Sequence, residues 1–303
     1  MTVLVIGNAT IDVSFEVDHL PEPGETLLTR SRFVDAGGKG LNQAVVAQRA
    51  GAAVVYISAV GNDPDADIIR RRLAEEGLST DHLRVHQGPT DQSIIYLAPG
   101  GENSIVSTAA RAASIDAEDA ESAIDLLEPA DVLLMQGNLR RDTTLDCLSR
   151  ARMRGVRVVL NPAPIAFDYD GIWPLVEVTV VNQVESRSLG KRADPEAAAH
   201  NLIALGTGAV VVTLGADGAL VVTPETAIRM AAPAVRAIDT TGAGDVFCGV
   251  LTAALSRGHT LVEAVPPAIA AASLSATRRG TSSALPTAAE LARTESDTAE
   301  VQT

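Results

Sequence analysis

Short runs of aliphatic and β-branched residues alternate with amphipathic stretches along most of this 303-residue chain. The runs are apolar at nearly every position, which is typical of strands that are buried on both faces of a sheet. Strands of that kind are joined in parallel through helices, and the helices cover the two faces. The alternation therefore predicts an α/β fold whose mainly parallel sheet lies between two layers of helices.

The expected elements follow one another with few gaps. The expected strands cover residues 3–6, 54–57, 132–135, 156–160, 178–181, 210–214 and 219–222. The expected helices cover residues 43–50, 65–76, 143–154, 195–205 and the stretch from Gly244 to Gly258. Several of these helices are followed by a glycine, which is a common helix-ending residue.

Two segments depart from this pattern. Residues 12–34 and 90–108 alternate apolar and polar positions between Pro and Gly, which is the period of half-exposed strands. We expect them to form a small separate β-sheet over one edge of the main sheet, as a lid or a dimer surface; ordinary surface hairpins are the alternative. Residues 293–303 form a polar tail, which we expect to be disordered after a last short helix.

Composition narrows the class of partner. A net charge of −14 without a concentrated basic patch argues against nucleic acid. Cys147 and Cys248 lie far apart and give neither a disulfide framework nor a zinc pattern. No apolar run reaches the roughly 20 residues that span a bilayer, and no targeting segment precedes the first strand. We therefore expect no membrane association and a cytoplasmic location.

The segment "DTTGAGDVFCG", residues 239–249, places a glycine-rich turn directly before an apolar helix. Free amides at a helix start attract anions, and glycines let the backbone approach a ligand closely. Asp245 falls in the first helical turn, beside any anion held there. One interpretation is a general base that takes a proton from an attacking hydroxyl while the amides stabilise a phosphoryl group. The alternative is that Asp245 only caps the helix.

A second glycine-rich turn, "AGGKGLNQA" from residue 36, also leads into a helix. It is not a Walker A motif, because Gly40 follows Lys39 where Ser or Thr is required. The first strand is followed by "IGNATID", which lacks the second glycine of a dinucleotide-binding turn. Lys39 and Asn42 suit the recognition of hydroxyl groups. The turn is therefore either a ligand-binding loop or a tight structural turn.

Together, "GGKGLNQA" and "DTTGAGDVF" resemble the two signature motifs of the ribokinase-like (PfkB) carbohydrate kinase family. The resemblance extends over nearly the whole chain in the same order, and within the family it is greatest to the ribokinases. It also includes "NATID" at 8–12, "PEPGET" at 21–26, "GENSI" at 101–105, "NPAP" at 161–164, "VNQVES" at 181–186, "TLGADGA" at 213–219 and "SATRRG" at 275–280.

The resemblance implies a three-layer α/β/α sandwich with a small β-sheet lid, formed here by residues 12–34 and 90–108 of a kinase domain at 1–292. Family members are often dimeric through the lid, so it implies a homodimer. The implied reaction is transfer of the γ-phosphoryl group of ATP to a sugar hydroxyl, as from ribose to ribose 5-phosphate. ATP and the sugar are then the small-molecule partners, with Mg²⁺ as the cofactor of ATP and K⁺ as an activating monovalent cation.

The family's functional positions match residues of this sequence. Asp245 matches the catalytic base, and the matching anion hole is formed by Gly242, Ala243 and Gly244. The sugar-binding positions match Asp12, Gly38, Lys39, Asn42, Asn138 and Asp245. The positions that contact the nucleotide and place magnesium and phosphate match Asn182, Glu185, Thr213, Gly215, Gly218 and Gly244. The positions that hold the monovalent cation match Asp239, Thr241, Ala276, Arg279 and Gly280.

Three positions differ from the ribokinase pattern. Thr10 stands where ribokinases usually carry Asn, Asn138 stands where they carry Glu, and Ala284 replaces a frequent hydroxyl near the cation loop. The first two alter the pattern of hydroxyl recognition, so another sugar or a nucleoside remains an alternative acceptor. An aromatic content of 3% weighs against a nucleoside, because bases are commonly bound by stacking. A binding module without catalysis is a further alternative, which the intact Asp245 opposes.

Overall fold

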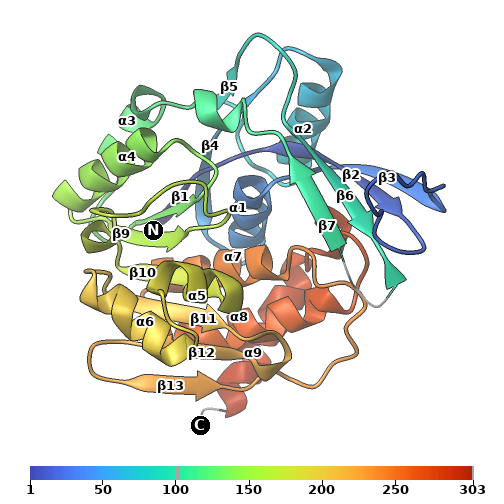
Figure 1. Cartoon of the computed structure of the whole chain (residues 1–303). Helices are drawn as coiled ribbons and strands as arrows, with labels where there is room; N and C mark the ends of the chain where they lie inside the picture. The colour runs from blue at the N-terminus through green and yellow to red at the C-terminus, as the bar shows by residue number, and fades with distance from the viewer. Residues whose placement is uncertain (100–102, 302–303) are drawn as a thin grey trace.

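The larger sheet contains nine strands within the residues that the structure, a computed structural model, describes: 1–99 and 103–301. Their order is β13 (Ala227–Met230), β12 (Ala219–Val222), β11 (Ala209–Thr213), β10 (Val178–Asn182), β9 (Arg157–Asn161), β8 (Val132–Gln136), β1 (Thr2–Ile6), β4 (Ala53–Val60) and β5 (Leu83–Val85). Neighbours from β5 to β11 pair in parallel, while β12 and β13 add antiparallel at one edge. The predicted mainly parallel sheet is confirmed (Figure 1).

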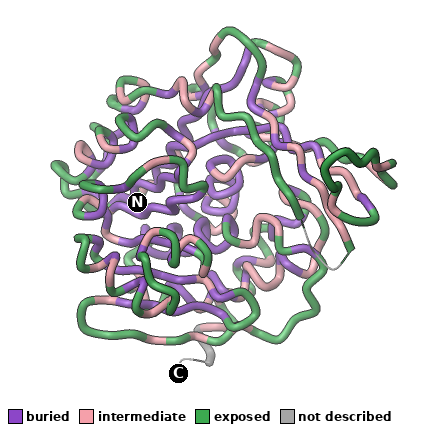
Figure 2. The backbone as a smooth tube through the Cα atoms, in the orientation of Figure 1, coloured by how far each residue is buried: buried purple, intermediate pink, exposed green. Residues whose placement is uncertain are grey.

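Helices cover both faces of this sheet. One layer contains α1 (Lys39–Arg49), α2 (Pro64–Glu75), α7 (Ala243–Ser256), α8 (Leu261–Ala276) and α9 (Ala288–Val301). The other contains α3 (Ala117–Asp125), α4 (Arg141–Met153), α5 (Gln183–Gly190) and α6 (Pro195–Ala204). Strand β1 contributes Val3 and Val5 to the first core and Leu4 and Ile6 to the second, because successive side chains point to opposite faces. The strands accordingly run through the buried interior (Figure 2).

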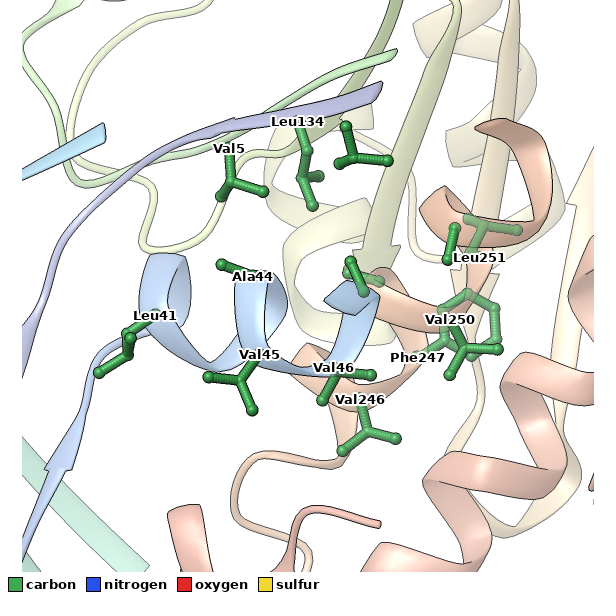
Figure 3. Packing of buried hydrophobic residues seen from close by; sticks show 14 of the residues in the cluster. Val5, Leu41, Ala44, Val45, Val46, Leu134, Val246, Phe247, Val250 and Leu251 are labelled. Atoms are coloured by element: carbon green, nitrogen blue, oxygen red, sulfur yellow. The ribbon is translucent and has the colours of Figure 1, made fainter. Parts of the chain in front are cut away.

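Close packing of α1 against α7 brings together two parts of the chain that are far apart in sequence. Val46 of α1 and Val246 and Val250 of α7 belong to one buried cluster below the sheet (Figure 3). A Cβ atom added at Gly249 would lie 2.6 Å from the Cβ of Val46, so the helices can approach this closely because that position has no side chain. The first turns of α1 and α7 therefore meet at one end of the sheet.

A separate four-stranded sheet forms in the two segments that alternate apolar and polar residues. Its order is β3 (Ser31–Gly37), β2 (Thr10–Glu16), β6 (Gln92–Leu97) and β7 (Asn103–Ser107), and it projects from the side of the main sheet (Figure 1). Strands β2 and β6 pair in parallel, and β3 and β7 add antiparallel on either side. The predicted small sheet is confirmed. Gly101 and Glu102 of the "GENSI" motif lie outside the described residues.

The C-terminal segment differs from the expected disorder. Helix α9 continues through Val301 and therefore includes most of the polar tail. Glu295 forms an ion pair with Arg257 at the end of α7, and the Thr298 hydroxyl donates to the Thr294 carbonyl. These contacts extend the helix beyond the point where the apolar pattern ends. Across the described residues, no helix is both long enough and apolar enough to cross a membrane.

Candidate active site

Polar residues gather where the parallel strands of the main sheet end. Asn161, Asn182 and Thr213 are the last residues of β9, β10 and β11. Strand β1 lies between β4 and β8, and the helices that follow β1 and β8 in the chain cover opposite faces of the sheet. In open α/β sheets, ligands bind outside the carboxyl ends of the strands at such a switch point. The starts of α1 and α7 lie at this edge.

Asp245 is buried in the first turn of α7, and it does not cap that helix. The N-cap is Gly242, whose φ of 79° is in the left-handed region that glycine adopts readily, and no side chain caps the helix. The Ala243 amide donates to the Thr240 carbonyl at 3.2 Å. The amides of Gly242 and Gly244 have no hydrogen-bond partner among the described residues. Within the described part of the chain, two amides at the helix start are thus unpaired, beside a carboxylate that does not cap the helix.

Side chains from the first turn of α1 surround the Asp245 carboxylate. The Asn42 amide donates to Oδ2 at 3.2 Å, and the Gln43 amide donates to Oδ1 at 3.0 Å. The Lys39 ammonium lies 3.7 Å from Oδ1, and its side chain is 37% exposed. The negative charge of Asp245 raises the pKa of Lys39, and Glu185 adds to this effect. Lys39 is therefore cationic, and two predicted sugar-binding residues lie directly at the predicted base.

Asp12 is a second buried carboxylate, placed by β2 at the base of the small sheet. Burial raises the pKa of Asp12 to about 6, and hydrogen bonds from Thr10 and Ser93 partly oppose the rise. The Thr10 hydroxyl donates to Oδ1 at 2.8 Å. The repulsion between Asp12 and Asp245 adds to the shift, which indicates that the two carboxylates share one region of the site.

A cavity of about 310 Å³ lies between the small sheet and the loop that follows α8. Charged side chains line it, including Asp12, Glu16, Asp35 and Arg279. The Arg279 guanidinium forms an ion pair with Glu16 at 3.1 Å, which joins this loop to strand β2. The small sheet makes a second contact at the start of α7, because the Asn103 amide donates to the Thr241 hydroxyl at 2.9 Å. The small sheet is thus connected to both loops next to Asp245.

A larger cavity of about 770 Å³ lies on the other side of the α7 start. Among the residues that the structure describes, no charged side chain lines it, and its walls are mostly small apolar residues. A Cβ atom added at Gly244 would meet nothing within 4 Å, so the backbone there faces open space. The predicted nucleotide-binding residues that line it are Asn182, Thr213, Gly215, Gly218 and Gly244. Five predicted positions from three parts of the chain thus share one cavity.

Asn182 and Glu185 form a capping box at the start of α5. Asn182 Oδ1 accepts hydrogen bonds from the amides of Val184 and Glu185 at 2.8 Å, and Glu185 Oε2 accepts from the Asn182 amide at 2.8 Å. This is a structural reason for the spacing of the two residues. Glu185 Oε1 has no hydrogen-bond partner among the described residues, and Glu185 raises the pKa of Lys39. Glu185 therefore retains one oxygen near the site.

Asp239 connects the turn before α7 to the turn after α8. Its Oδ1 accepts from the Thr241 amide at 2.9 Å, and its Oδ2 accepts from the Gly280 amide at 3.0 Å. The Ala276 carbonyl accepts from the Ile238 and Asp239 amides at 2.8 and 3.2 Å. The predicted cation-site positions are therefore adjacent. The described part of the chain contains no group of three or more His, Cys, Asp or Glu residues that could hold a metal ion.

Asn138 lies beyond the end of β8 and is not among the residues that line either cavity. Its Oδ1 and the hydroxyl of Tyr169 are both buried, and neither has a hydrogen-bond partner in the described part of the chain. A Cβ atom added at the neighbouring Gly137 would lie 2.8 Å from that hydroxyl. The region around Asn138 therefore contains two buried polar atoms that could each take part in a hydrogen bond.

Three polar residues at the site were not predicted from the sequence. Gln43, Gln136 and Asn161 are buried, and the Gln43 amide lies within hydrogen-bond distance of both of the others. Each stands in a segment with a detectable signal. Gln43 follows Asn42 in the first signature motif, Asn161 begins "NPAP", and Gln136 ends an apolar strand. A polar residue at an otherwise apolar position of a predicted helix or strand was the signal that could have identified these residues.

The comparisons with known proteins agree with this geometry. The model for "pfkB family carbohydrate kinase" matches residues 2–288. A ribokinase from Haemophilus influenzae is 33% identical over 295 residues, which cover 95% of this chain and 96% of that protein. The solved ribokinase of Thermotoga maritima has a TM-score of 0.85 and 31% identity, covering 97% of this chain and 99% of its own. A ribokinase of Cryptococcus neoformans, solved in complex with ADP, has a TM-score of 0.84 and 27% identity. The match covers 96% of this chain and 98% of that chain.

Proposed function

The chain belongs to the pfkB family of carbohydrate kinases, and from this premise we propose that it phosphorylates ribose to ribose 5-phosphate. It is an ATP-dependent sugar kinase, a phosphotransferase with an alcohol group as acceptor. One observation carries the proposed mechanism: the buried Asp245 carboxylate lies between the polar first turn of α1 and the free amides of Gly242 and Gly244.

In the proposed reaction, Asp245 accepts the proton of the attacking sugar hydroxyl. The amides of the glycine-rich turn at 242–244 stabilise the charge on the phosphoryl group during transfer. Lys39 stands 3.7 Å from Asp245 and supplies the nearest positive charge. A positioned general base contributes about 10²–10⁴-fold to such a rate. We assign Asp12, Gly38 and Asn42 to the sugar hydroxyls, because the two side chains are buried beside Asp245 and Gly38 directly precedes α1.

ATP fits the larger cavity. Its volume and apolar walls suit a base and ribose, and Gly244 leads from it to Asp245. We assign Thr213, Gly215 and Gly218 to the nucleotide. When bound, Mg²⁺ neutralises charge on the phosphates of ATP. The carboxylate oxygen that Glu185 keeps free is a suitable hard ligand on the site side of α5, and Asn182 holds Glu185 in place through the capping box.

We assign the monovalent cation, K⁺, to the junction that Asp239 makes between the two turns. A carboxylate and main-chain carbonyls are the oxygen donors that such a cation requires. Thr241, Ala276 and Gly280 lie within one hydrogen bond of Asp239, as the distances above describe. Arg279 can take part only through its carbonyl, because its guanidinium pairs with Glu16.

The small sheet acts, in this proposal, as the lid of a single kinase domain at residues 1–292, with 293–303 as an appended tail. It contacts both loops beside Asp245, so it can exclude water when sugar is bound. The small sheet and its connecting segment carry exposed apolar side chains, which support a homodimer through the lid: Leu28, Phe33, Val34, Ile105 and Val106. We place the enzyme in the cytoplasm, where ATP is available as the phosphoryl donor.

Another sugar or a nucleoside is the second candidate acceptor, and Thr10 and Asn138 favour it. Thr10 already occupies one oxygen of Asp12, and Asn138 offers an amide where ribokinases carry a carboxylate. Restoring both residues in the Thr10→Asn, Asn138→Glu variant should raise kcat/KM for ribose about 10-fold relative to other pentoses, since one well-placed polar contact is worth about that much. An unchanged preference would show that these positions do not select the sugar.

The proposed function is tested by incubating the protein with Mg-ATP and a panel of ribose, 2-deoxyribose, fructose and adenosine, while ADP release is followed. The position of the new phosphate is then read by ³¹P NMR. The proposal expects the highest kcat/KM with ribose and a 5-phosphate product. A higher kcat/KM with another acceptor would give the function to the second candidate, and absence of turnover with tight sugar binding would identify a non-catalytic binding module.

A further inference from the structure

We propose that Gln43 is a positioning residue that holds the Asp245 carboxylate in its reactive orientation, and that the main-chain carbonyl of Val180 fixes the polarity of Gln43 through Asn161. The inference rests on the proposed role of Asp245 as the base, and it adds a role for residues that do not contact either substrate. Its evidence is a chain of buried hydrogen bonds that begins in β10 and ends at Asp245.

Gln43 is fully buried in α1 between apolar neighbours, where an uncharged polar side chain needs partners for every polar atom. Its amide nitrogen donates to Asp245 Oδ1 at 3.0 Å and to Asn161 Oδ1 at 3.2 Å. Its carbonyl oxygen accepts from the amide nitrogen of Gln136 at 2.8 Å. The side chain therefore uses both of its donor hydrogens and its acceptor, and it links α1 to β8, β9 and the start of α7.

The direction of this chain is determined at both ends, because a main-chain carbonyl and a carboxylate have no hydrogen to donate. The carbonyl of Val180 can only accept a hydrogen bond, and the amide nitrogen of Asn161 donates to it at 2.9 Å. Asn161 must then turn its oxygen toward Gln43, and Gln43 must turn its nitrogen toward Asn161. The same nitrogen faces Asp245. Val180, through Asn161, thus requires the same orientation of the Gln43 amide that Asp245 requires, so both ends of the chain fix it as a donor to the carboxylate.

Uncharged donors therefore bind both oxygens of the Asp245 carboxylate. Gln43 holds Oδ1, and Asn42 holds Oδ2. These two bonds fix the plane of the carboxyl group, so that the remaining lone pairs keep one direction in space. Lys39 does not give the same precision, because its flexible side chain is about one third exposed and lies 3.7 Å away. The correct orientation of a reacting group contributes strongly to the reaction rate, and small displacements of that group lower the rate.

The test uses Gln43→Met, which keeps the length and volume of the side chain and removes its polar atoms. We expect kcat to fall about 10- to 100-fold, as for a misplaced catalytic group, while KM for the sugar and the dissociation constant of ADP change less than about threefold. Gln48→Met is the matched control: it carries the same substitution in the same helix, and no hydrogen bond joins Gln48 to the site within the described residues. It should leave kcat unchanged.

A second variant, Gln43→Glu, separates polarity from packing. Glutamate has the same shape, but an oxygen replaces the donor that faces Asp245. At pH 8 we expect kcat to fall at least as far as in Gln43→Met, because two carboxylates would then face each other. If Gln43→Glu keeps more than about half of the wild-type kcat, the side chain acts only by filling space and the proposal is wrong.

Action through Asp245 is tested with a double-mutant cycle. In an Asp245→Asn background, Gln43→Met should lower the residual rate less than about threefold, since the group it positions is no longer the base. An undiminished 10- to 100-fold loss in that background would overturn the proposal. The cycle also distinguishes two failures. If Asp245→Asn alone is nearly fully active, the proposed function of Asp245 fails; if it is inactive while Gln43→Met is normal, only the role of Gln43 fails.

Discussion

The two cavities beside Asp245 differ in the way their walls are built. The cavity below the small sheet, about 310 Å³, is lined by charged groups from Asp12, Glu16, Asp35 and Arg279. The cavity beyond the α7 start, about 770 Å³, is lined by alanines, glycines, valines and a few short polar residues without any charge. Of the two, only the larger is lined by residues of the first turn of α7, Ala243 and Gly244, within the described part of the chain. The acidic side chains that line the two cavities, those of Asp12, Glu16 and Asp35, thus all belong to the smaller one.

The difference shows two ways of binding a hydrophilic ligand. A small sugar exposes hydroxyls in every direction, so directed side chains recognise it and leave a buried group unpaired when a hydroxyl is missing. A nucleotide carries anionic phosphates, which acidic walls would repel; backbone amides at a helix start bind them without side-chain charge. Substitutions on the two sides should therefore affect different substrates.

The largest expected effect lies at the start of α7, where Asp245 is buried. Asp245→Asn should lower kcat by at least about 10²-fold, because the general base is lost. Its affinity for ADP should change less than about threefold, since the amides of the turn remain. Steady-state kinetics and calorimetric titration with ADP measure the two values. A rate close to that of the wild type would leave Asp245 without a catalytic role.

Asp12→Asn should have the next largest effect, and it should alter the kinetics with the sugar but not the binding of the nucleotide. We expect kcat/KM for the sugar to fall about 10- to 100-fold, because a buried charged acceptor is lost, with the ADP dissociation constant unchanged. An equal loss of affinity for both substrates would break the distinction between the two cavities.

The same substitution should remove a pH dependence. The pKa of Asp12 is raised to about 6 by burial and by the nearby carboxylates of Asp35 and Asp245. In the wild type, KM for the sugar should therefore rise as the pH falls through about 6, and in Asp12→Asn it should stay flat there. Because this pKa lies above the value of 3.8 for an unburied Asp, ionisation of Asp12 also costs stability as the pH rises from about 4 to about 6, so Asp12→Asn should melt higher at pH 8.

Ala272→Leu tests the apolar side with a smaller expected effect. Ala272 lines the larger cavity, and three added carbon atoms would occupy part of it. We expect KM for ATP to rise about 5- to 10-fold, as for the loss of about one kcal/mol of binding, without a change in KM for the sugar. Ala270→Leu, two positions earlier on α8 and away from the cavity walls, is the control. A shift of both KM values would indicate that α8 itself had moved.

Arg279→Ala should have the smallest effect, although it removes the charge that joins the small sheet to the domain. The Arg279 side chain is 76% exposed, and ion pairs of that kind contribute about 1 kcal/mol or less. We expect a change in sugar KM of less than about fivefold, measured against Arg30→Ala, which breaks an exposed pair with Asp18 in the segment between β2 and β3. A loss of 10-fold or more would give this ion pair a role in closing the lid.

Much of the fold could be predicted because local patterns encode it. The continuous apolar runs at 132–135 and 210–214 became β8 and β11 with one residue added or shifted at an end. Helix α8 was missed: Pro266 and Pro267 lie inside it, and proline is a strong local signal against a helix. Packing of its buried alanines against α7 overrides that signal. The end of α9 was missed because its contact with Arg257 is not local.

The candidate site could be predicted in part. The two glycine-rich turns were identified as the starts of helices, and their side chains meet at Asp245. The sequence did not identify Gln43 or Asn161, because a buried amide has no distinctive spacing and gains its meaning only from its partners. Arg279 was placed at a cation site by resemblance, whereas its guanidinium lies against Glu16 of the small sheet. The roles assigned to these residues remain predictions.

By itself, the sequence determined the elements of this protein: buried strands, the helices between them, a small alternating sheet, and glycines before two helices. Such features depend on interactions between residues a few positions apart, so a local pattern carries them. Only the tertiary structure decided that Asn42 and Asp245, 203 positions apart, share a hydrogen bond, and that Asp12 is buried enough to raise its pKa to about 6. Contacts and burial of that kind arise from close packing, here the approach of α1 and α7 at Gly249, which no single segment specifies.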